Sequence, residues 1–378
     1  MKSNKVVLSI NLLNFNSDKL AGVGYFFKRI ASNIDFNDSK WKVFDEIVIL
    51  SNTKVDCIEL FGFKKSEKIK VVKVPLVHNF LFRIAFEQLI LPFWLFKEKN
   101  VFYSPTPSIP LFAKVINSKN ILISTIHDMI PFKVKNKYSF FRSIYVKLIS
   151  NKSAQVSDKV ITVSEFSKKD IAEITKIKLS KIEVVYNFIP ELKHTVGNET
   201  KAYFVTVCTI EPGKNIENMI IGFNKFLKEN ENLVNYRYII IGQFGWNYDS
   251  IISLTKSLGL EDKIEFKGYL SDSEKNDFIR NCTCMVYLSK YEGFGIPPLE
   301  AMYFDKISIV SNTSSLPEVV GNAGIIQDPD DTDLLAKNLR LLVDDVSIYK
   351  SSIERQLNKF NPEIQISNFT DIILNSIR

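Results

Sequence analysis

Short apolar runs alternate with helical stretches along most of this chain. In the first half the strand-like runs are residues 6–12, 46–50, 70–74, 120–126 and 159–163. After a polar interval they resume at residues 203–207, 236–241, 264–266, 285–288 and 308–310. This alternation is typical of β-α-β repeats. The pattern therefore predicts an α/β protein with two parallel-sheet domains.

The polar interval at residues 190–201 marks the junction between the two domains. We expect an N-terminal Rossmann-like domain at residues 1–188 and a C-terminal one at residues 189–360. Residues 361–378 read as a terminal helix. Because ligands bind beyond the carboxyl ends of parallel strands and pockets favour domain interfaces, we expect the active site in a cleft between the domains.

Composition agrees with such a protein, since the 378 residues are 46% hydrophobic and 24% charged. No apolar run approaches the roughly 20 residues that span a bilayer. The first strand starts at about Lys5, which leaves no room for a signal peptide, so we expect a cytoplasmic protein. The cysteines form no spaced framework, and we expect buried free thiols rather than a metal site at Cys57, Cys208, Cys282 and Cys284.

Residues 291–302, Tyr-Glu-Gly-Phe-Gly-Ile-Pro-Pro-Leu-Glu-Ala-Met, carry the most informative chemistry. Gly293 and Gly295 allow a sharp turn, and Pro297 and Pro298 are tolerated where a helix begins. We expect a helix from about residue 298. The uncovered N–H groups and the helix dipole would favour a diphosphate there, through Phe294, Gly295, Ile296 and Leu299.

Two glutamates flank this turn. Glu300 would lie in the first helical turn, where a carboxylate repels a diphosphate but accepts hydrogen bonds from a ribose diol. Glu292 would face another part of the same ligand. The alternative is that Glu300 only stabilises the start of the helix.

The segment resembles the Glu-x₇-Glu motif of retaining glycosyltransferases of family 4. The resemblance implies the GT-B fold, in which two Rossmann-like domains face a central cleft. It also implies that the terminal helix at residues 361–378 crosses back onto the first domain. By position it implies that Glu300 binds the nucleotide ribose, that residues 293–296 face the diphosphate and that Glu292 contacts the donor sugar. It also implies front-face departure of the diphosphate, which itself takes the acceptor proton.

Lys214 follows the first strand of the second domain, in the loop at residues 207–215. By itself it reads as a surface lysine, but the resemblance implies that it binds the donor diphosphate as a point charge. Family members often carry an additional arginine in this segment, and Thr209 and Gly213 occupy those places here. The second cation would come from the N-terminal domain, or Lys214 and backbone N–H groups would act without one.

His127 lies at the carboxyl end of a predicted strand, in residues 125–131. Such a histidine can be structural, but its position resembles the cleft histidine of the family, which contacts the donor sugar. We expect it to donate a hydrogen bond to a sugar hydroxyl, and Asp128 to orient the loop. A lone Gly-x-Gly at Gly22 and Gly24 is weak by itself, and the resemblance places it beside the diphosphate or the acceptor.

The acidic run at residues 328–331 suggests a metal site, because clustered carboxylates bind Mg²⁺. We expect instead that Asp330 or Asp331 caps a helix. The resemblance implies neutralisation by protein cations, so we expect neither a metal nor another cofactor.

Positive charge gathers in the first half, with 30 lysines and arginines against 16 acids in residues 1–190 and 19 against 26 afterwards. Residues 129–157 are basic and aromatic without an acid. They form either a solvated face or a surface for anionic lipid or a lipid-diphosphate acceptor. No recognition motif supports nucleic acid.

The sequence thus predicts a retaining hexosyltransferase that moves a sugar from a nucleotide-diphosphate sugar to a hydroxyl of a glycan or lipid-linked acceptor. Likeness to mannosyltransferase-type members favours GDP-mannose and surface polysaccharide synthesis of the O-antigen or capsule type. The protein would then be cytoplasmic or peripheral on the inner face of the plasma membrane. Two alternatives stay open: a non-catalytic protein that binds sugar nucleotides or glycans, and a nucleotide-sugar epimerase.

Overall fold

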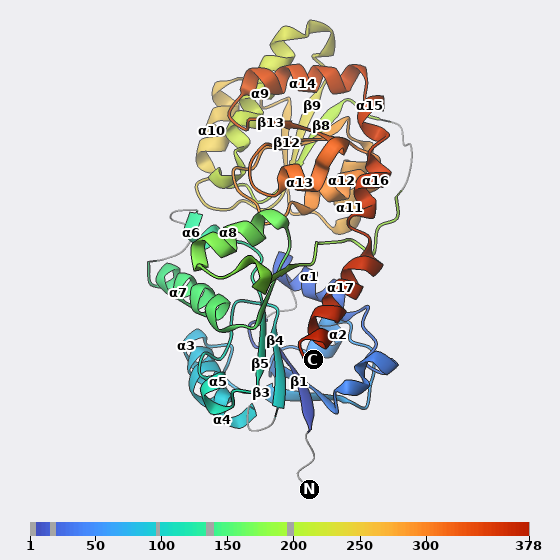
Figure 1. The fold of residues 1–378 in the computed structure, drawn as a ribbon. Coiled ribbons are helices and arrows are strands. Elements are labelled where there is room, and N and C mark those ends of the chain that lie inside the picture. The colour runs from blue at the N-terminus through green and yellow to red at the C-terminus, as the bar shows by residue number, and fades with distance from the viewer. Residues whose placement is uncertain (1–4, 16–19, 96–98, 134–139, 195–199, 378) are drawn as a thin grey trace. The chain divides into compact units, whose positions relative to one another are not determined.

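A computed structural model describes residues 5–15, 20–95, 99–133, 140–194 and 200–377 (Figure 1). The chain forms two compact units. One unit comprises Met1–Phe188 and Pro362–Arg378, and the other comprises Ile189–Asn361. Each unit is built on a parallel sheet with helices. The predicted α/β fold class with two Rossmann-like domains is therefore confirmed.

The described part of the first unit contains a seven-stranded sheet of order β3-β2-β1-β4-β5-β6-β7. Its strands are β1 (Val6–Asn11), β2 (Glu46–Asn52), β3 (Ile69–Val74), β4 (Lys99–Ser104), β5 (Ile121–Thr125), β6 (Lys159–Thr162) and β7 (Ile182–Val184). Its α-helices are α1 (Gly22–Ala31), α2 (Cys57–Phe61), α3 (Phe80–Ala85), α4 (Leu91–Leu95), α5 (Ala113–Ile116), α6 (Ile130–Lys133), α7 (Phe140–Val156), α8 (Glu165–Thr175) and α17 (Pro362–Asn375). A π-helical segment, η2 (Phe86–Ile90), joins α3 to α4.

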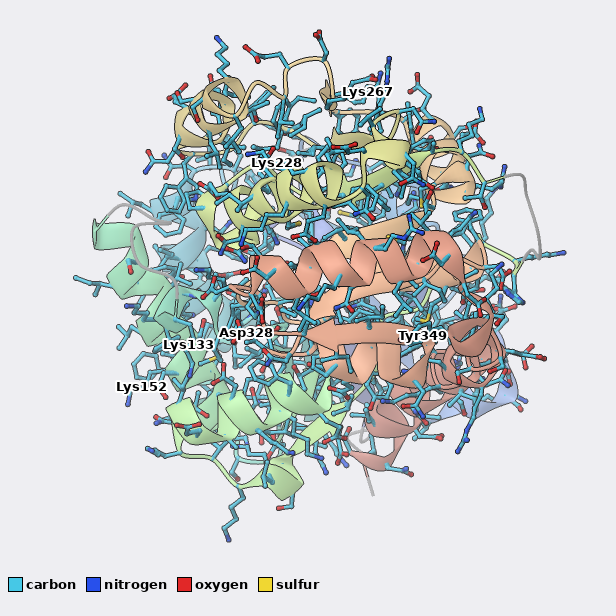
Figure 2. All side chains as sticks on the ribbon, turned by 90° about the horizontal axis from the view of Figure 1, so that it is seen from above. Lys133, Lys152, Lys228, Lys267, Asp328 and Tyr349 are labelled. Carbon is cyan, nitrogen blue, oxygen red and sulfur yellow. The ribbon has the colours of Figure 1, made fainter. Side chains whose placement is uncertain are left out.

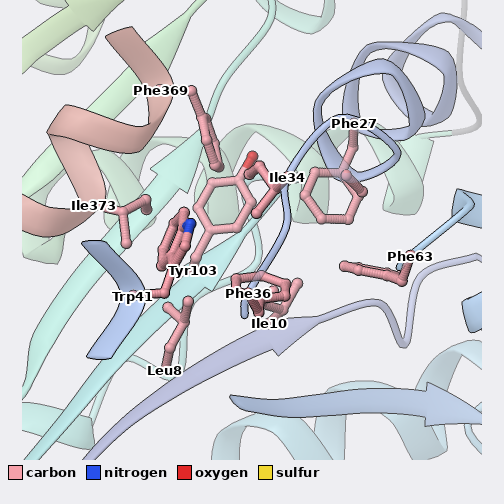
Figure 3. Close-up of a pocket in the computed structure, with 11 residues that line it drawn as sticks. Leu8, Ile10, Phe27, Ile34, Phe36, Trp41, Phe63, Tyr103, Phe369 and Ile373 are labelled. Atoms are coloured by element: carbon pink, nitrogen blue, oxygen red, sulfur yellow. The ribbon is translucent and has the colours of Figure 1, made fainter. Parts of the chain in front are cut away.

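Central strands such as β1 and β4 are buried on both faces of this sheet, since consecutive buried residues along a strand point to opposite faces. Val7 and Phe102 pack with Phe86 and Leu91 on one face. Tyr103, one residue along β4, lies on the other face, where it lines a narrow apolar cavity (Figure 3). Helix α17 closes that cavity with residues from the end of the chain.

Helix α17 is part of the core of the first unit. The rings of Phe369 and Tyr103 meet edge to face, with centroids 5.1 Å apart, and Ile373 lines the same cavity (Figure 3). The Gln365 side chain accepts a hydrogen bond from the backbone N–H of Tyr186 at 2.9 Å. The aromatic contact and this hydrogen bond fix the last helix against the sheet.

The described part of the second unit contains a six-stranded sheet of order β10-β9-β8-β11-β12-β13. Its strands are β8 (Tyr203–Val207), β9 (Arg237–Ile241), β10 (Ile264–Gly268), β11 (Cys284–Tyr287), β12 (Ser308–Ser311) and β13 (Gly324–Gln327). Its α-helices are α9 (Ile216–Glu229), α10 (Asp249–Ser257), α11 (Asp272–Asn281), α12 (Ile296–Tyr303), α13 (Leu316–Val320), α14 (Thr332–Asp344), α15 (Ser347–Lys350) and α16 (Ile353–Asn358).

Helices α9 and α14 lie side by side (Figure 2). Lys225 of α9 pairs with Asp333 of α14 at 2.6 Å. The N-cap of α14 is Asp331, whose side chain accepts the N–H of Leu334 at 2.8 Å. The capping expectation for the acidic run that begins at Asp328 is confirmed, because this carboxylate completes a helix start.

The strand-like runs taken from the apolar pattern do not include three strands of the structure: β4, β7 and β13. Strand β7 has three residues and lies at the sheet edge. Strand β13 begins with Gly324, where a Cβ atom would lie 2.8 Å from the Ser308 carbonyl oxygen. These strands are short or begin with residues that weaken a strand signal.

The cysteines are free thiols in the structure. Cys57, Cys282 and Cys284 are buried, as expected, but Cys208 is partly exposed, because it lies just beyond the end of β8. The strand predicted at residues 285–288 lies one residue earlier, since β11 runs from Cys284 to Tyr287, and Cys282 is the C-cap of α11.

Candidate active site

The turn before α12 has the predicted sharp geometry. Gly295 is its N-cap, with φ of +108°, a conformation that L side chains rarely adopt. A Cβ atom there would also lie 2.6 Å from Leu316 Cδ2. The helix begins at Ile296, two residues earlier than expected, because its first turn accommodates both prolines. Glu300 therefore lies in the second turn, which corrects the prediction that it occupies the first.

Serine side chains hold this turn from the neighbouring strand β12 and the loop after it. The Ser315 hydroxyl donates to the Phe294 carbonyl at 2.7 Å and lies 3.0 Å from the Glu292 carbonyl oxygen. Ser311 donates to the Ser289 carbonyl at 2.6 Å. These contacts occupy carbonyls of the turn and of the segment just before it, so side chains outside the motif help to set the path of the turn.

Lys214 and Glu292 form an ion pair with 2.5 Å between Nζ and Oε1. The sheet explains the meeting, because β8 and β11 are adjacent parallel strands and their following loops leave the same edge. The Lys290 backbone N–H also donates to the Gly213 carbonyl at 3.1 Å, which ties the two loops together. The two predicted donor-site residues are therefore brought into direct contact.

This pair is ionised although both side chains are largely buried, at 17% and 12% exposure. Burial disfavours both charges and is the largest influence on Glu292, but the Lys214 charge and the hydrogen bonds that Glu292 accepts together lower its pKa. Glu292 in turn raises the pKa of Lys214 well above its ordinary value. Tyr287 donates its hydroxyl to Glu292 Oε1 at 2.9 Å, which adds to the stabilisation of the carboxylate.

Glu300 is also paired, with Lys275 of α11. Their Nζ and Oε1 atoms lie 2.7 Å apart, and the two side chains are 17% and 7% exposed. Burial opposes the ammonium charge and is the largest influence, but Glu300 and Asp272 together outweigh it, so the pKa of Lys275 is raised. No motif marked Lys275 in the sequence, since the contact depends on how α11 packs against α12.

The first unit holds His127 and Gly24, the remaining predicted site residues. The His127 ring makes a hydrogen bond to the backbone of Pro105. Proline offers only a carbonyl, so the histidine nitrogen is the donor there. Its Nε2 atom is buried and has no hydrogen-bond partner among the described residues. Burial lowers the pKa of His127 to about 4, so Nε2 carries a lone pair at neutral pH.

This tautomer changes the chemistry expected of His127. With the proton on Nδ1, Nε2 can accept a hydrogen bond but cannot donate one, whereas the sequence led us to expect His127 to donate. The imidazole ring lies edge-on to Phe26 of α1, with centroids 5.1 Å apart. Helix α1 thus fixes the ring plane, and Asp128 accepts the N–H of Ile130 at 2.9 Å, as expected of a loop-orienting residue.

Gly24 lies inside α1, where a Cβ atom would meet Leu20 Cδ2 at 2.7 Å. Close packing against Leu20 is therefore one reason for glycine at this position. Gly22 opens the helix with no atom within 4 Å of such a Cβ. The contact of Gly24 with a diphosphate or acceptor stays a prediction.

Gly242 is a structural requirement of the donor unit that the sequence reading missed. It follows β9 with φ of +146°, and a Cβ atom would lie 1.8 Å from the Cys208 carbonyl oxygen. The signal available was a glycine directly after a buried strand. This close approach places the loop after β9 against the loop that leads to Lys214.

Among the described residues, every helix is too short or too polar to span a membrane. The histidine, cysteine and acidic side chains of the described residues also form no group of three or more placed to hold a metal ion.

Comparison with known families matches most of the chain. The family described as glycosyl transferases group 1 matches residues 189–358, and the family described as glycosyltransferase family 4 matches residues 65–191. The fold is of the GT-B class, and the two matches together run from residue 65 to residue 358. The chain is therefore similar to glycosyltransferases of family 4, as the resemblance of residues 292–300 to the motif of that family predicts.

Similar proteins include two bacterial enzymes of known role. The chain is 30% identical over 236 residues to O-antigen chain mannosyltransferase B of Escherichia coli, and 30% identical over 234 residues to O-antigen chain mannosyltransferase RfbU of Salmonella typhimurium. The alignments cover 59% and 61% of this chain and 61% and 64% of those relatives. The shared region is thus less than two thirds of each relative.

A solved structure shares the fold along nearly the whole chain. HepE of Anabaena in complex with UDP-glucose has a TM-score of 0.71 and 15% sequence identity, over 98% of this chain and 99% of HepE. This similarity confirms the GT-B fold class.

Proposed function

We propose that this protein is a retaining, metal-independent glycosyltransferase. It transfers a sugar from a nucleotide-diphosphate sugar to a hydroxyl of a glycan or lipid-linked acceptor. The departing diphosphate takes the acceptor proton on the same face of the sugar, so no separate side-chain base is required. His127 and Glu292 act at the sugar, and Glu300 binds the ribose.

One observation carries this proposal: the turn at residues 292–295 joins the Lys214–Glu292 pair to the helix that presents Glu300. The pair supplies a cation and a sugar-facing carboxylate from adjacent strand ends. The turn supplies backbone N–H groups at the start of α12. A donor bound here would contact Lys214, Gly293, Phe294, Gly295, Ile296 and Glu300.

The relatives support the substrate class. Two are named for mannosyl transfer to the O-antigen chain, which favours a GDP-mannose donor and a surface-polysaccharide acceptor. HepE was solved with UDP-glucose, which makes UDP-sugars the main competing donors. The nucleobase of the donor must therefore be determined by measurement.

Calorimetric titration with GDP, UDP and dTDP in EDTA tests the donor site. We expect one nucleotide to bind, and Glu300→Ala to weaken it by about ten- to a thousandfold, because charge-assisted hydrogen bonds contribute roughly 1.5–3 kcal/mol each. Glu217→Ala on the surface of α9 is the matched control and should bind normally. Equal binding by Glu300→Ala and the wild type would refute the site assignment.

Product analysis separates transfer from the two alternatives. A transferase consumes the donor sugar quickly only when acceptor is present and retains the anomeric configuration. An epimerase converts the donor without acceptor, and a binding protein leaves it unchanged. Loss of transfer in EDTA with recovery on adding Mg²⁺ would show that the leaving-group site is wrongly described.

We also propose that the first unit docks on an anionic membrane. The predicted stretch at residues 129–157 includes α6 and α7, while Lys135, Lys137 and Tyr138 lie outside the described residues. Not all of its charge faces water, because Lys133 pairs with Asp170 at 3.0 Å. Lys133 and Lys152 mark this region in Figure 2.

The neighbouring helices add apolar side chains to this region. Helix α3 contacts α7 through the rings of Phe80 and Tyr145, whose centroids are 5.0 Å apart. In the described residues from α3 to α7, the large apolar side chains that are at least half exposed are Leu81, Leu89, Phe93, Phe112, Val115, Ile144 and Leu148. Exposed apolar residues beside basic ones suit the interface of an anionic bilayer.

Vesicle flotation at low salt tests this docking. We expect binding to vesicles with anionic lipid and not to neutral ones, and loss of binding in Leu81→Ser/Phe93→Ser. Val234→Ser/Leu341→Ser removes exposed apolar residues from the second unit and should bind like the wild type. A wild-type protein that stays in solution with anionic vesicles would refute the proposal.

A further inference from the structure

Lys275 makes a contact that the family motif does not assign. It lies on α11, whose first turn is fixed by reciprocal capping between Ser271 and Glu274. From there its ammonium reaches Glu300 of α12, with 2.7 Å between Nζ and Oε1. Lysine is seldom as buried as this unless it is paired. Because Lys275 is largely buried, its ammonium depends on the ion pair with Glu300.

A second acid competes weakly for the same ammonium. Asp272 lies 3.1 Å from Lys275 Nζ, but its side chain is 79% exposed. Water screens such a surface contact strongly. Glu300 is almost fully buried, so it is the partner that determines where the Lys275 ammonium lies.

The pair bears directly on how Glu300 can bind hydroxyls. An ammonium that holds one oxygen of a carboxylate fixes the directions in which its acceptor positions point. The lysine removes rotational freedom from the carboxylate and cancels its charge. Cancellation matters because the proposed ligand brings a diphosphate to the same segment, and like charges in a buried site repel strongly.

We propose that Lys275 is a positioning residue that sets ribose recognition by the donor site. It holds the Glu300 carboxylate in one orientation, so that the carboxylate accepts hydrogen bonds from the ribose hydroxyls. This inference rests on the proposed function, because it requires Glu300 to bind the ribose. The alternative is a salt bridge that only ties α11 to α12.

Comparison of ribose and deoxyribose ligands distinguishes these roles. The probes are GDP and UDP with their 2′-deoxy and 3′-deoxy forms, titrated by calorimetry. Whichever of the two nucleotides binds to the wild-type protein is used for all variants. We expect the wild type to prefer the ribose form by about tenfold or more, as for one hydrogen bond to a charged group. In Lys275→Met this preference should fall to about threefold or less.

Control variants distinguish a loss of ribose preference from a general loss of protein stability. Ser271→Ala loses the cap of α11 but keeps Lys275 and Glu300, so it should keep the wild-type ribose preference. Lys275→Arg retains the charge and should keep most of it. If Lys275→Met does not fold, Lys275→Gln replaces it, with the same expected fall because it also lacks the charge.

The outcome separates this inference from the proposed function. Loss of ribose preference in both Glu300→Ala and Lys275→Met supports the positioning role. Loss in Glu300→Ala with an unchanged preference in Lys275→Met overturns it and leaves the donor site intact. An unchanged preference in Glu300→Ala overturns both, because Glu300 would not bind the ribose.

Discussion

At the scale of single residues, the donor site consists of ion pairs where the sequence suggested separate groups. Lys214 and Glu292 lie 78 positions apart, and Lys275 and Glu300 lie 25 positions apart. The motif identified Lys214, Glu292 and Glu300 by residue type and spacing. It could not show their partners, because each pairing depends on which loops meet at the sheet edge and how two helices pack.

The Lys214–Glu292 pair should show strong coupling in a double-mutant cycle. Lys214→Met or Glu292→Gln alone should lower the free energy of unfolding by about 3–5 kcal/mol, because each leaves a buried group without its partner. The double variant should lose less than the sum of the two, with coupling of at least about 1 kcal/mol. Urea unfolding at pH 7 measures these free energies. If the double variant loses the full sum of the two single losses, the buried ion pair is contradicted.

His127 should make stability depend on pH in the mildly acidic range. Its folded pKa of about 4 lies below the ordinary value of 6.5, so the unfolded chain binds a proton first as the pH falls. Stability should therefore drop by about 2 kcal/mol from pH 6.5 to pH 4 through this group. Urea unfolding at pH 7, 5.5 and 4.5 should show a flatter profile for His127→Gln. An equal slope in both proteins would mean that the imidazole is not buried in its neutral form.

At the scale of elements, the apolar pattern located the longer strands within one or two residues. It missed β4 although this strand is central, because only Val101, Phe102 and Tyr103 are apolar and a polar pair precedes them. Periodicity detects a strand by its own side chains, whereas β4 is held by neighbours on both sides. The early start of α12 had a similar cause, since Ile296 carries no helix-start signal of its own.

Gly295 provides a test of the turn before α12. Gly295→Ala should lower the free energy of unfolding by about 2–3 kcal/mol, because it combines a left-handed backbone with a clash against Leu316. Gly259 also has a positive φ, of +66°, but no atom within 4 Å of a Cβ. Gly259→Ala is therefore the matched control and should lose about 1 kcal/mol. Equal losses in urea unfolding would show that the Leu316 contact relaxes at no cost.

At the scale of the whole molecule, the fold class followed from alternating strands and helices, and the family followed from a single motif. Those inferences succeeded because both features are local in the sequence. The donor, the acceptor and the membrane surface were harder, because they depend on loops and on side chains from several helices. The exposed apolar residues of α3 to α5, for example, have no sequence signature that separates them from a core.

Because α17 packs in the core of the first unit, a mutation in this helix should destabilise strands and helices far from it in the sequence. Phe369→Ala should cost about 3–5 kcal/mol, because it opens a cavity beside Tyr103. Hydrogen exchange with mass spectrometry should show faster exchange in peptides of β1, β4 and α1. The exposed Ile364 on the same helix is the control, and Ile364→Ala should leave these peptides unchanged. Faster exchange confined to the second unit would contradict this packing.

The same helix has a consequence for synthesis of the protein. The ribosome makes residues 1–188 first, but Phe369 and Ile373, which line the core of that unit, are made after the entire second unit. The second unit is a continuous segment and has all its residues as soon as Asn361 is made. During translation the later unit thus has its complete core before the earlier one, and the apolar side chains around Tyr103 lack the cover of Phe369 and Ile373 until α17 is made.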